Sequence, residues 1–116
     1  MGYTDEFFDW WDTLSAEEQV DVKAVVDVLS EKGPSLRRPG VGPIVTSRHA
    51  ANIKELIIQP GGRPYRVLFA FDLRRTAILL MGGDKTGNGH WYDEFVPIAD
   101  KLYDDPITQL KKEGKI

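Results

Sequence analysis

The 116-residue chain contains no cysteine and only two histidines, His49 and His90. Without cysteine, neither a disulfide framework nor a thiolate metal site can form. The two histidines lie far apart in the sequence, and neither an HExxH pattern nor a pair of acidic ligands accompanies them. The sequence therefore predicts that the protein uses no metal ion and no cofactor.

Long apolar runs are absent as well. No stretch approaches the ~20 apolar residues of a membrane span, and no basic leader followed by an apolar segment opens the chain. We therefore expect a cytoplasmic protein that does not enter a membrane. A chain of 116 residues has the usual length of one domain, so residues 1–116 are expected to form a single domain.

The net charge of −3 conceals a strong separation of charge along the chain. Residues 1–31 hold nine acidic residues and one basic residue, a charge of −8, whereas residues 32–90 hold three acidic and ten basic residues, a charge of +7. Residues 91–116 carry −2, with six acidic and four basic residues. A basic segment of this kind is what phosphate binding requires. The alternative is that these bases only offset the charge of acidic helices.

Two helices are predicted ahead of the basic segment. Residues 4–14 place apolar side chains at i, i+3, i+4 and i+7, which form one stripe of Phe7, Trp10, Trp11 and Leu14. Ser15 and Glu18 form a capping box that opens a second helix, which ends near Lys32 ahead of a Gly-Pro pair. Because almost no spacer separates the two helices, we expect a helical hairpin that covers one face of a sheet.

Three short strands are predicted at residues 53–58, 64–71 and 76–82. Two glycines in the first turn can adopt the positive φ that a tight connection needs. The second connection, residues 72–75, is short enough for antiparallel pairing. The strands therefore form a three-stranded, mainly antiparallel meander, and together with the helices they predict an α+β fold.

Alternation along the second strand separates two faces of the sheet. One face carries the apolar and aromatic residues Tyr65, Val67, Phe69 and Phe71. Arg66 points to the other face, where strand pairing could also place Glu55. Two interpretations of this pair stay open: an ion pair that only stabilises the sheet, or two side chains of a functional site.

The remaining segments connect and close this core. Residues 33–52 form a long proline- and glycine-rich connection, and loops of this length are often functional. Residues 82–89 are glycine-rich but lack the GxxxxGK[ST] spacing of a P-loop; their backbone amides and Lys85 could still hold one phosphate. Residues 91–104 predict a C-terminal helix, and residues 105–116 are expected to form a frayed tail.

Glutamate, arginine, lysine, histidine and tyrosine around basic strands suit the metal-independent cleavage of RNA. In this reaction the 2′-hydroxyl attacks the adjacent phosphate. The site needs a base for the hydroxyl, cations for the crowded phosphorane, and a proton donor for the leaving 5′-oxygen. Arginine and lysine are complementary cations, because one is a planar fork and the other a point charge. No nucleophile-elbow pattern supports a Ser-His-Asp triad instead.

Six strings occur in a characteristic order: EFFDWWDTLS, GPSLRRP, SRHAANIKELI, GRPYRVLFAFD, LLMGGDKTG and HWYDEFVPIADKLYD. In this order they resemble the RelE/ParE toxin superfamily, and within it the phage-derived, HigB-like branch of type II toxin–antitoxin modules. The resemblance covers roughly residues 4–108. It implies a RelE-like fold, with a helical hairpin packed on a small mixed sheet. It also implies a ribosome-dependent endoribonuclease that cleaves mRNA and inhibits translation.

The resemblance also implies a set of catalytic residues. Arg66 in PYRV matches the strand arginine of the family, and Lys85 matches the basic residue after the last long strand; both would stabilise the phosphorane. Glu55 stands in the first meander strand, where the family places acidic or basic site residues. Glu55 or Tyr92 would remove the 2′-hydroxyl proton, and Tyr92 or His90 would donate a proton to the leaving group.

Three further basic residues, Arg48, Lys54 and Arg63, are expected to contact RNA phosphates rather than to take part in the chemistry. The chain departs from the family in its acidic overall charge and at its start, since many relatives have a strand before the first helix. Either the start is truncated, or Tyr3 and Thr4 supply a short strand.

The expected partners are mRNA, the ribosome and a cognate antitoxin, a small helix-turn-helix protein with which the toxin would form a hetero-oligomer. A second function stays open because one scaffold can host both: a ParE-like toxin would bind and inhibit DNA gyrase without catalysing a reaction. A third possibility is a phage relic that binds its antitoxin but no longer poisons the cell.

Overall fold

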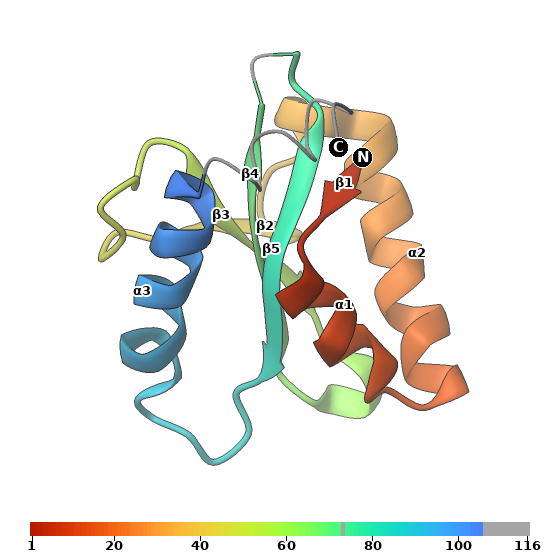
Figure 1. Cartoon of the computed structure of the whole chain (residues 1–116). Helices are drawn as coiled ribbons and strands as arrows, with labels where there is room; N and C mark the ends of the chain where they lie inside the picture. The colour runs from red at the N-terminus through yellow and green to blue at the C-terminus, as the bar shows by residue number, and fades with distance from the viewer. Residues whose placement is uncertain (73, 106–116) are drawn as a thin grey trace.

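The helices and strands follow the predicted order along the chain. A computed structural model describes residues 1–72 and 74–105, and Figure 1 shows how they are arranged. The elements are β1 (Gly2–Tyr3), α1 (Asp5–Asp12), α2 (Ala16–Lys32), the short 3-10 helix η1 (Gly33–Ser35), β2 (Val41–Pro43), β3 (Ile53–Ile58), the 3-10 helix η2 (Pro60–Gly62), β4 (Tyr65–Phe71), β5 (Ala77–Asp84) and α3 (Trp91–Asp104). Apart from Asp105, the predicted frayed tail lies outside the described residues.

The described strands form one mixed sheet of five strands in the order β1-β5-β4-β3-β2. β1 runs parallel to β5, and the other neighbouring pairs are antiparallel. The predicted α+β fold and the antiparallel meander of β3, β4 and β5 are therefore confirmed. The prediction of a sheet with only three strands is corrected, because an edge strand is added on each side.

Both added strands are short and lie at the edges of the sheet. β2 lies inside the segment predicted as a loop, and its three residues carry no alternating pattern. β1 places Gly2 opposite Ile78 and Tyr3 opposite Leu79, and Thr4 N–H then donates to the Leu79 carbonyl over 3.0 Å. Strands this short form because a neighbouring edge offers backbone groups, not because of their own pattern. The short strand suggested for Tyr3 and Thr4 is present one residue earlier, at Gly2–Tyr3.

The predicted capping box of α2 is present, and α1 begins with a cap as well. Thr4 Oγ1 accepts a hydrogen bond from Phe7 N–H over 3.0 Å at the start of α1. In the capping box of α2, Ser15 Oγ accepts from Glu18 N–H over 3.2 Å, and Glu18 Oε1 accepts from Ser15 N–H over 2.8 Å. Among the described residues, no helix is both long enough and apolar enough to cross a membrane.

The sheet is covered on both faces, by α1 and α2 on one side and by α3 on the other (Figure 1). The buried core on the α1–α2 side consists of Phe7, Val22, Leu29, Val41, Leu56, Ile58, Tyr65, Val67, Phe69, Ala77 and Leu79. The buried core on the α3 side consists of Ile44, Ile53, Leu68, Ala70, Ile78, Leu80, Trp91, Val96, Ala99 and Leu102. Because helices cover both faces of the sheet, β5 carries apolar side chains on both of its faces.

Two adjacent glycines in β5 allow aromatic rings to approach the strand from opposite faces. A Cβ atom at Gly82 would lie 2.2 Å from Cε3 of Trp10, and one at Gly83 would lie 2.7 Å from Nε1 of Trp91. Successive residues of a strand face opposite sides. Trp10 of α1 therefore packs on one face of β5 and Trp91 of α3 on the other.

The connection that precedes β3 is fixed to the C-terminal half of α3. Ser47 Oγ donates to Asp100 Oδ1, and Arg48 N–H donates to Asp100 Oδ2 over 3.1 Å. Arg48 Nη2 and His49 Nε2 lie 2.7 and 2.8 Å from the Asp104 carboxylate. Asp100 is only 4% exposed, so the hydrogen bonds from Ser47 and Arg48 offset the cost of burying its carboxylate.

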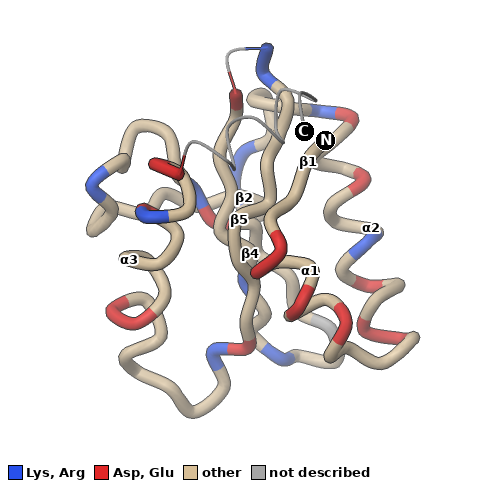
Figure 2. Tube along the Cα trace, viewed as in Figure 1, with Lys and Arg blue, Asp and Glu red and all other residues tan. Residues whose placement is uncertain are grey.

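Charge is separated in space as well as in sequence. Figure 2 shows acidic residues spaced along α1 and α2, whereas the basic residues lie mainly on the strands and connections. The basic segment recognised in the sequence therefore belongs to the sheet and its loops. The acidic segment belongs to the helical hairpin that covers one face.

Candidate active site

Four of the five predicted catalytic residues lie on the α3 side of the sheet. In the β3–β4 ladder Glu55 is opposite Leu68, a residue of the core under α3. Arg66 shares this face with Leu68, because the two are separated by two positions in β4. Lys85, just after β5, and Tyr92, in the first turn of α3, contact each other on the same side. Residues from two strands, from the segment after β5 and from a helix are thus brought to one face.

Glu55 and Arg66 form the ion pair that the sequence left open. Arg66 Nε lies 3.3 Å from Glu55 Oε1, and the two side chains are only 12% and 11% exposed. Arg66 Nη1 donates to the backbone carbonyl of Tyr65 over 2.8 Å. Buried Arg66 Nε has no well-aligned hydrogen bond to any described residue, although the carboxylate is close. The guanidinium is therefore held in place beside the Glu55 carboxylate.

Lys85 and Tyr92 form a second pair. Lys85 Nζ donates to the phenolic oxygen of Tyr92 over 3.0 Å and lies 4.6 Å from the centroid of its ring. The Lys85 N–H donates to the Pro64 carbonyl over 3.0 Å, which extends the β4–β5 ladder beyond the end of β5. The Tyr92 ring packs edge-on against buried Trp91, with centroids 5.2 Å apart. Because the phenolic oxygen accepts from Lys85, its own proton can be given to a third group.

His90 takes part in neither pair. It precedes the first turn of α3, and its side chain is 83% exposed. Its ring Nδ1 lies 3.4 Å from Asp93 Oδ2, and its N–H donates to Asn88 Oδ1 over 2.9 Å. Its role as a proton donor stays a prediction, and so do the catalytic roles of the other four residues.

The three residues expected to contact RNA lie away from these pairs and apart from one another. Arg48 forms an ion pair with Asp104 at the end of α3, and Arg63 lies 3.4 Å from Glu18 of α2. Lys54, in β3, lies on the α1–α2 side, since alternation turns it away from the face that carries Glu55. Contact with RNA by these residues stays a prediction.

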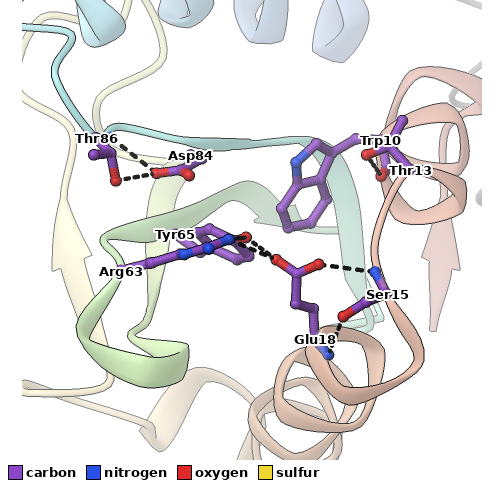
Figure 3. A network of polar contacts seen from close by, with 8 residues as sticks. All are labelled: Trp10, Thr13, Ser15, Glu18, Arg63, Tyr65, Asp84 and Thr86. Atoms are coloured by element: carbon purple, nitrogen blue, oxygen red, sulfur yellow. Dashed lines mark hydrogen bonds and ion pairs between the residues drawn. The ribbon is translucent and has the colours of Figure 1, made fainter.

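Arg63 belongs to a polar network that joins α2 to β4 (Figure 3). Tyr65 donates its phenolic proton to Glu18 Oε2, and Arg63 Nη1 lies 3.3 Å from the Tyr65 oxygen. The hydrogen bond from Tyr65, followed by those from Ser15, lowers the pKa of Glu18. The same bond to Glu18 is the main reason that the pKa of Tyr65 is raised. Because Tyr65 faces α1 and α2, the network stabilises the packing of the hairpin on the sheet.

Replacing Glu18 with glutamine is expected to remove an acid-sensitive part of the free energy of unfolding. The folded-state pKa of Glu18 lies below its ordinary value of 4.5. Its ionised form therefore stabilises the fold above this value, and that contribution is lost as the pH falls through the lowered folded-state pKa. Glutamine can still complete the capping box. Urea unfolding from neutral to acidic pH should show a difference between wild type and Glu18→Gln that shrinks toward low pH; a constant difference would contradict the assignment.

Sequence reasoning missed two polar clusters, the bonds of Asp100 to the connection before β3 and the contact of Glu18 with Tyr65. Glu18 and Tyr65 are 47 positions apart in the sequence. The one available signal was the strand alternation that turns Tyr65 toward the helical hairpin. In residues 1–72 and 74–105, no group of three or more His, Asp or Glu side chains is placed to hold a metal ion.

The α+β fold, with a helical hairpin and a C-terminal helix on opposite faces of a mixed sheet, is compatible with the RelE-like architecture. Residues 9–104 match the family described as Phage derived protein Gp49-like, and the chain belongs to this family of RelE- and HigB-like toxins. The resemblance found in the sequence is therefore confirmed. No solved structure matches the chain significantly.

Two curated relatives come from Mycobacterium tuberculosis. The protein named "Putative toxin HigB3" is 45% identical over 93 residues, which cover 79% of this chain and 79% of the relative. The protein named "Putative toxin HigB2" is 40% identical over 104 residues, which cover 88% of this chain and 51% of the relative, so the chain spans about half the length of that relative. These relatives support a toxin of a toxin–antitoxin system, a class that implies a cognate antitoxin.

Proposed function

We propose that this toxin is an endoribonuclease that cleaves mRNA on the ribosome and so inhibits translation. The observation that carries the proposal is the placement of Glu55, Arg66, Lys85 and Tyr92 on one face of the sheet, as an acidic group, two cations and a phenol. These are the groups that a transfer between the 2′-hydroxyl and the adjacent phosphate requires.

In the proposed mechanism the 2′-oxygen attacks the phosphorus, and the bond from phosphorus to the 5′-oxygen breaks. Glu55 removes the 2′-hydroxyl proton once a phosphate oxygen has engaged the Arg66 guanidinium beside it. Arg66 and Lys85 stabilise the negative charge that develops on the phosphorane. Tyr92 donates its proton to the leaving 5′-oxygen, since its phenolic oxygen already accepts a hydrogen bond from Lys85.

After that transfer, the phenolate oxygen of Tyr92 would face the Lys85 ammonium 3.0 Å away. This contact favours the tyrosine over His90 as the proton donor, because the charge left on the donor is stabilised at once. Glu55 has a similar arrangement with Arg66. Each proton-transfer group of the mechanism is thus paired with a cation.

For the cognate antitoxin, we propose a small helix-turn-helix protein that forms a hetero-oligomer with the toxin. Acidic residues of such a partner would complement the basic strands and connections. Co-expression with the product of the neighbouring reading frame should then restore growth and co-purify a second chain.

Induction of the toxin is expected to produce discrete breaks in messages that are being translated. Primer extension would map the new ends, and purified toxin with programmed ribosomes should give the same ends with free 5′-hydroxyl groups. A 2′-deoxy substitution at the cleaved nucleotide should abolish the cut, because it removes the nucleophile. Cleavage should survive chelation of added metal, provided that ribosomes whose magnesium has been restored serve as the control.

The competing function, inhibition of DNA gyrase, predicts a different result. Messages would stay intact while DNA breaks accumulate, and purified toxin would inhibit supercoiling. That outcome would refute the nuclease proposal. Intact messages together with intact DNA would indicate a relic that has lost its toxicity.

A further inference from the structure

A basic groove lies at the β2 edge of the sheet. It has a volume of about 660 Å³ and is formed by residues between 34 and 43 together with Lys54 of β3. Arg37, Arg38 and Lys54 line it, and none of the residues that line it is acidic. These three residues are called the groove cations below. The groove therefore presents positive charge in a concave surface large enough for a phosphate and its sugar.

The groove cations differ in their partners from three other arginines of the chain. Arg48, Arg63 and Arg66 each form an ion pair with a carboxylate. In the described part of the chain, no carboxylate forms an ion pair with any groove cation. Their charge is consequently available to an anion from outside the chain, without the cost of breaking an internal pair.

The local fold also positions the groove cations. Arg37 Nη1 donates to the Pro34 carbonyl over 2.6 Å, and the Arg37 carbonyl accepts from the N–H groups of Gly40 and Val41 over 3.1 and 3.3 Å. Lys54 is opposite Pro43 in the β2–β3 ladder and is half-buried. The short strand β2 thus serves to bring the loop arginines beside a lysine that belongs to the meander.

The sheet separates the groove from the candidate active site. Lys54 is opposite Phe69, whose ring belongs to the core on the α1–α2 side. Glu55, the next residue, is opposite Leu68 of the core on the α3 side. The groove is therefore a second site on the opposite face.

We propose that the groove binds the phosphodiester backbone of RNA and anchors the toxin while cleavage takes place on the other face. The proposal rests on the function proposed above, since it takes RNA as the ligand. The guanidinium groups of Arg37 and Arg38 and the ammonium of Lys54 suit phosphate oxygens. Contacts with phosphates carry no sequence information directly. The RNA is either ribosomal RNA or the part of the mRNA that flanks the cleaved nucleotide.

The test uses a double variant, Arg38→Ala with Lys54→Ala, in the full chain. Its matched control, Arg74→Ala with Lys101→Ala, likewise removes two cations that form no ion pair among the described residues. Both are exposed, and neither lines the groove. The two probes are a single-stranded 2′-O-methyl RNA, which cannot be cleaved, and ribosomes programmed with the same RNA. Thermal unfolding of both variants verifies that they remain folded.

The groove variant is expected to bind about tenfold more weakly or worse, because two charge-assisted contacts are lost. If the two replaced side chains each contact a phosphate of single-stranded RNA, the slope of log K against log salt concentration should become smaller in magnitude by about 1.4. The control variant should keep wild-type affinity and slope. Weaker binding to both probes assigns the groove to mRNA, and weaker binding only to ribosomes assigns it to ribosomal RNA.

The inference would be overturned if the groove variant bound both probes with wild-type affinity and salt dependence. It would also be overturned if the control variant lost as much affinity as the groove variant. Cleavage of unmodified mRNA by wild-type toxin is measured separately. Absence of cleavage refutes the proposed nuclease, whereas the binding data still decide the role of the groove. If the nuclease proposal is right, the groove variant should show a higher KM for programmed ribosomes with an unchanged kcat.

Discussion

Single-turnover cleavage of mRNA on the ribosome is expected to slow by about 10²–10³-fold when Arg66 or Lys85 is replaced with alanine. In the proposed mechanism both side chains stabilise the charge that develops on the phosphorane, and each is held by a defined contact. Arg66 lies beside Glu55, with Nε and Oε1 3.3 Å apart, and Lys85 donates to Tyr92 over 3.0 Å. Removing a preorganised donor lowers the rate of the chemical step more than it weakens binding of the substrate.

The Arg66→Lys variant tests whether the reaction needs only the positive charge of Arg66 or also the planar shape of its guanidinium group. The lysine keeps the positive charge but loses the planar fork, so the variant should stay clearly impaired if two donors contact the phosphate. The matched control is Arg63→Ala, which removes another ion-paired arginine from beside β4 on the α1–α2 side. At saturating toxin this control should cleave at close to the wild-type rate, because Arg63 is expected to contribute to association with RNA and not to the chemical step.

Stability must be measured beside activity, because Arg66→Ala leaves the buried Glu55 carboxylate without its partner. If Arg66 serves only the ion pair, thermal unfolding and activity will decline together. Lys85→Ala avoids this difficulty, since Lys85 pairs with a neutral phenol at a partly exposed position. Wild-type cleavage rates in folded Arg66→Ala and Lys85→Ala variants would refute the site assignment.

The largest effect on stability is expected for Gly82→Ala. The new Cβ atom would lie 2.2 Å from the indole of Trp10, a distance at which one of the two must move. The indole cannot simply rotate away, because it packs edge-on against both Phe7 and Tyr65. Displacing it moves α1 away from β5, which we expect to cost about 3 kcal/mol or more. The melting temperature should then fall by roughly 10 °C.

Gly89→Ala provides the control for this experiment. No heavy atom lies within 4 Å of a Cβ built at Gly89, so alanine is expected to change the melting temperature little. Circular dichroism melts of the two variants and wild type would measure the difference. Equal melting temperatures for Gly82→Ala and wild type would show that α1 and β5 are not packed as closely as described.

The elements that sequence reasoning predicted well carry their signals within a few residues. The capping box of Ser15 and Glu18 is local, and the structure shows both of its hydrogen bonds. The strands of the meander are runs of six to eight residues rich in apolar side chains and bounded by turn residues, so their type and order could be predicted. β2 could not, because its three residues owe their conformation to the free edge of β3.

The sequence indicated which residues form the candidate site, but not all of the contacts between them. Resemblance to the toxin family pointed to Arg66 and Lys85, and alternation indicated that Glu55 could share a face with Arg66. Sequence reasoning did not connect Lys85 with Tyr92, since that contact depends on how the loop before α3 returns the helix to the sheet. It also did not distinguish the paired arginines from the unpaired cations of the groove, because ion pairs join residues that are distant in sequence.

The sequence by itself determined the helical hairpin, the meander, the family and the segment that carries the basic residues, because periodicity, capping and motif order act over short distances. The tertiary structure alone decided which charges meet. It buried Glu55 against Arg66, placed Lys85 on Tyr92, and left the groove cations, two ahead of β2 and one in β3, without an acidic partner among the described residues. The physical reason is that Coulomb and hydrogen-bond energies depend on distance in space. That distance is set by the packing of helices on both faces of the sheet.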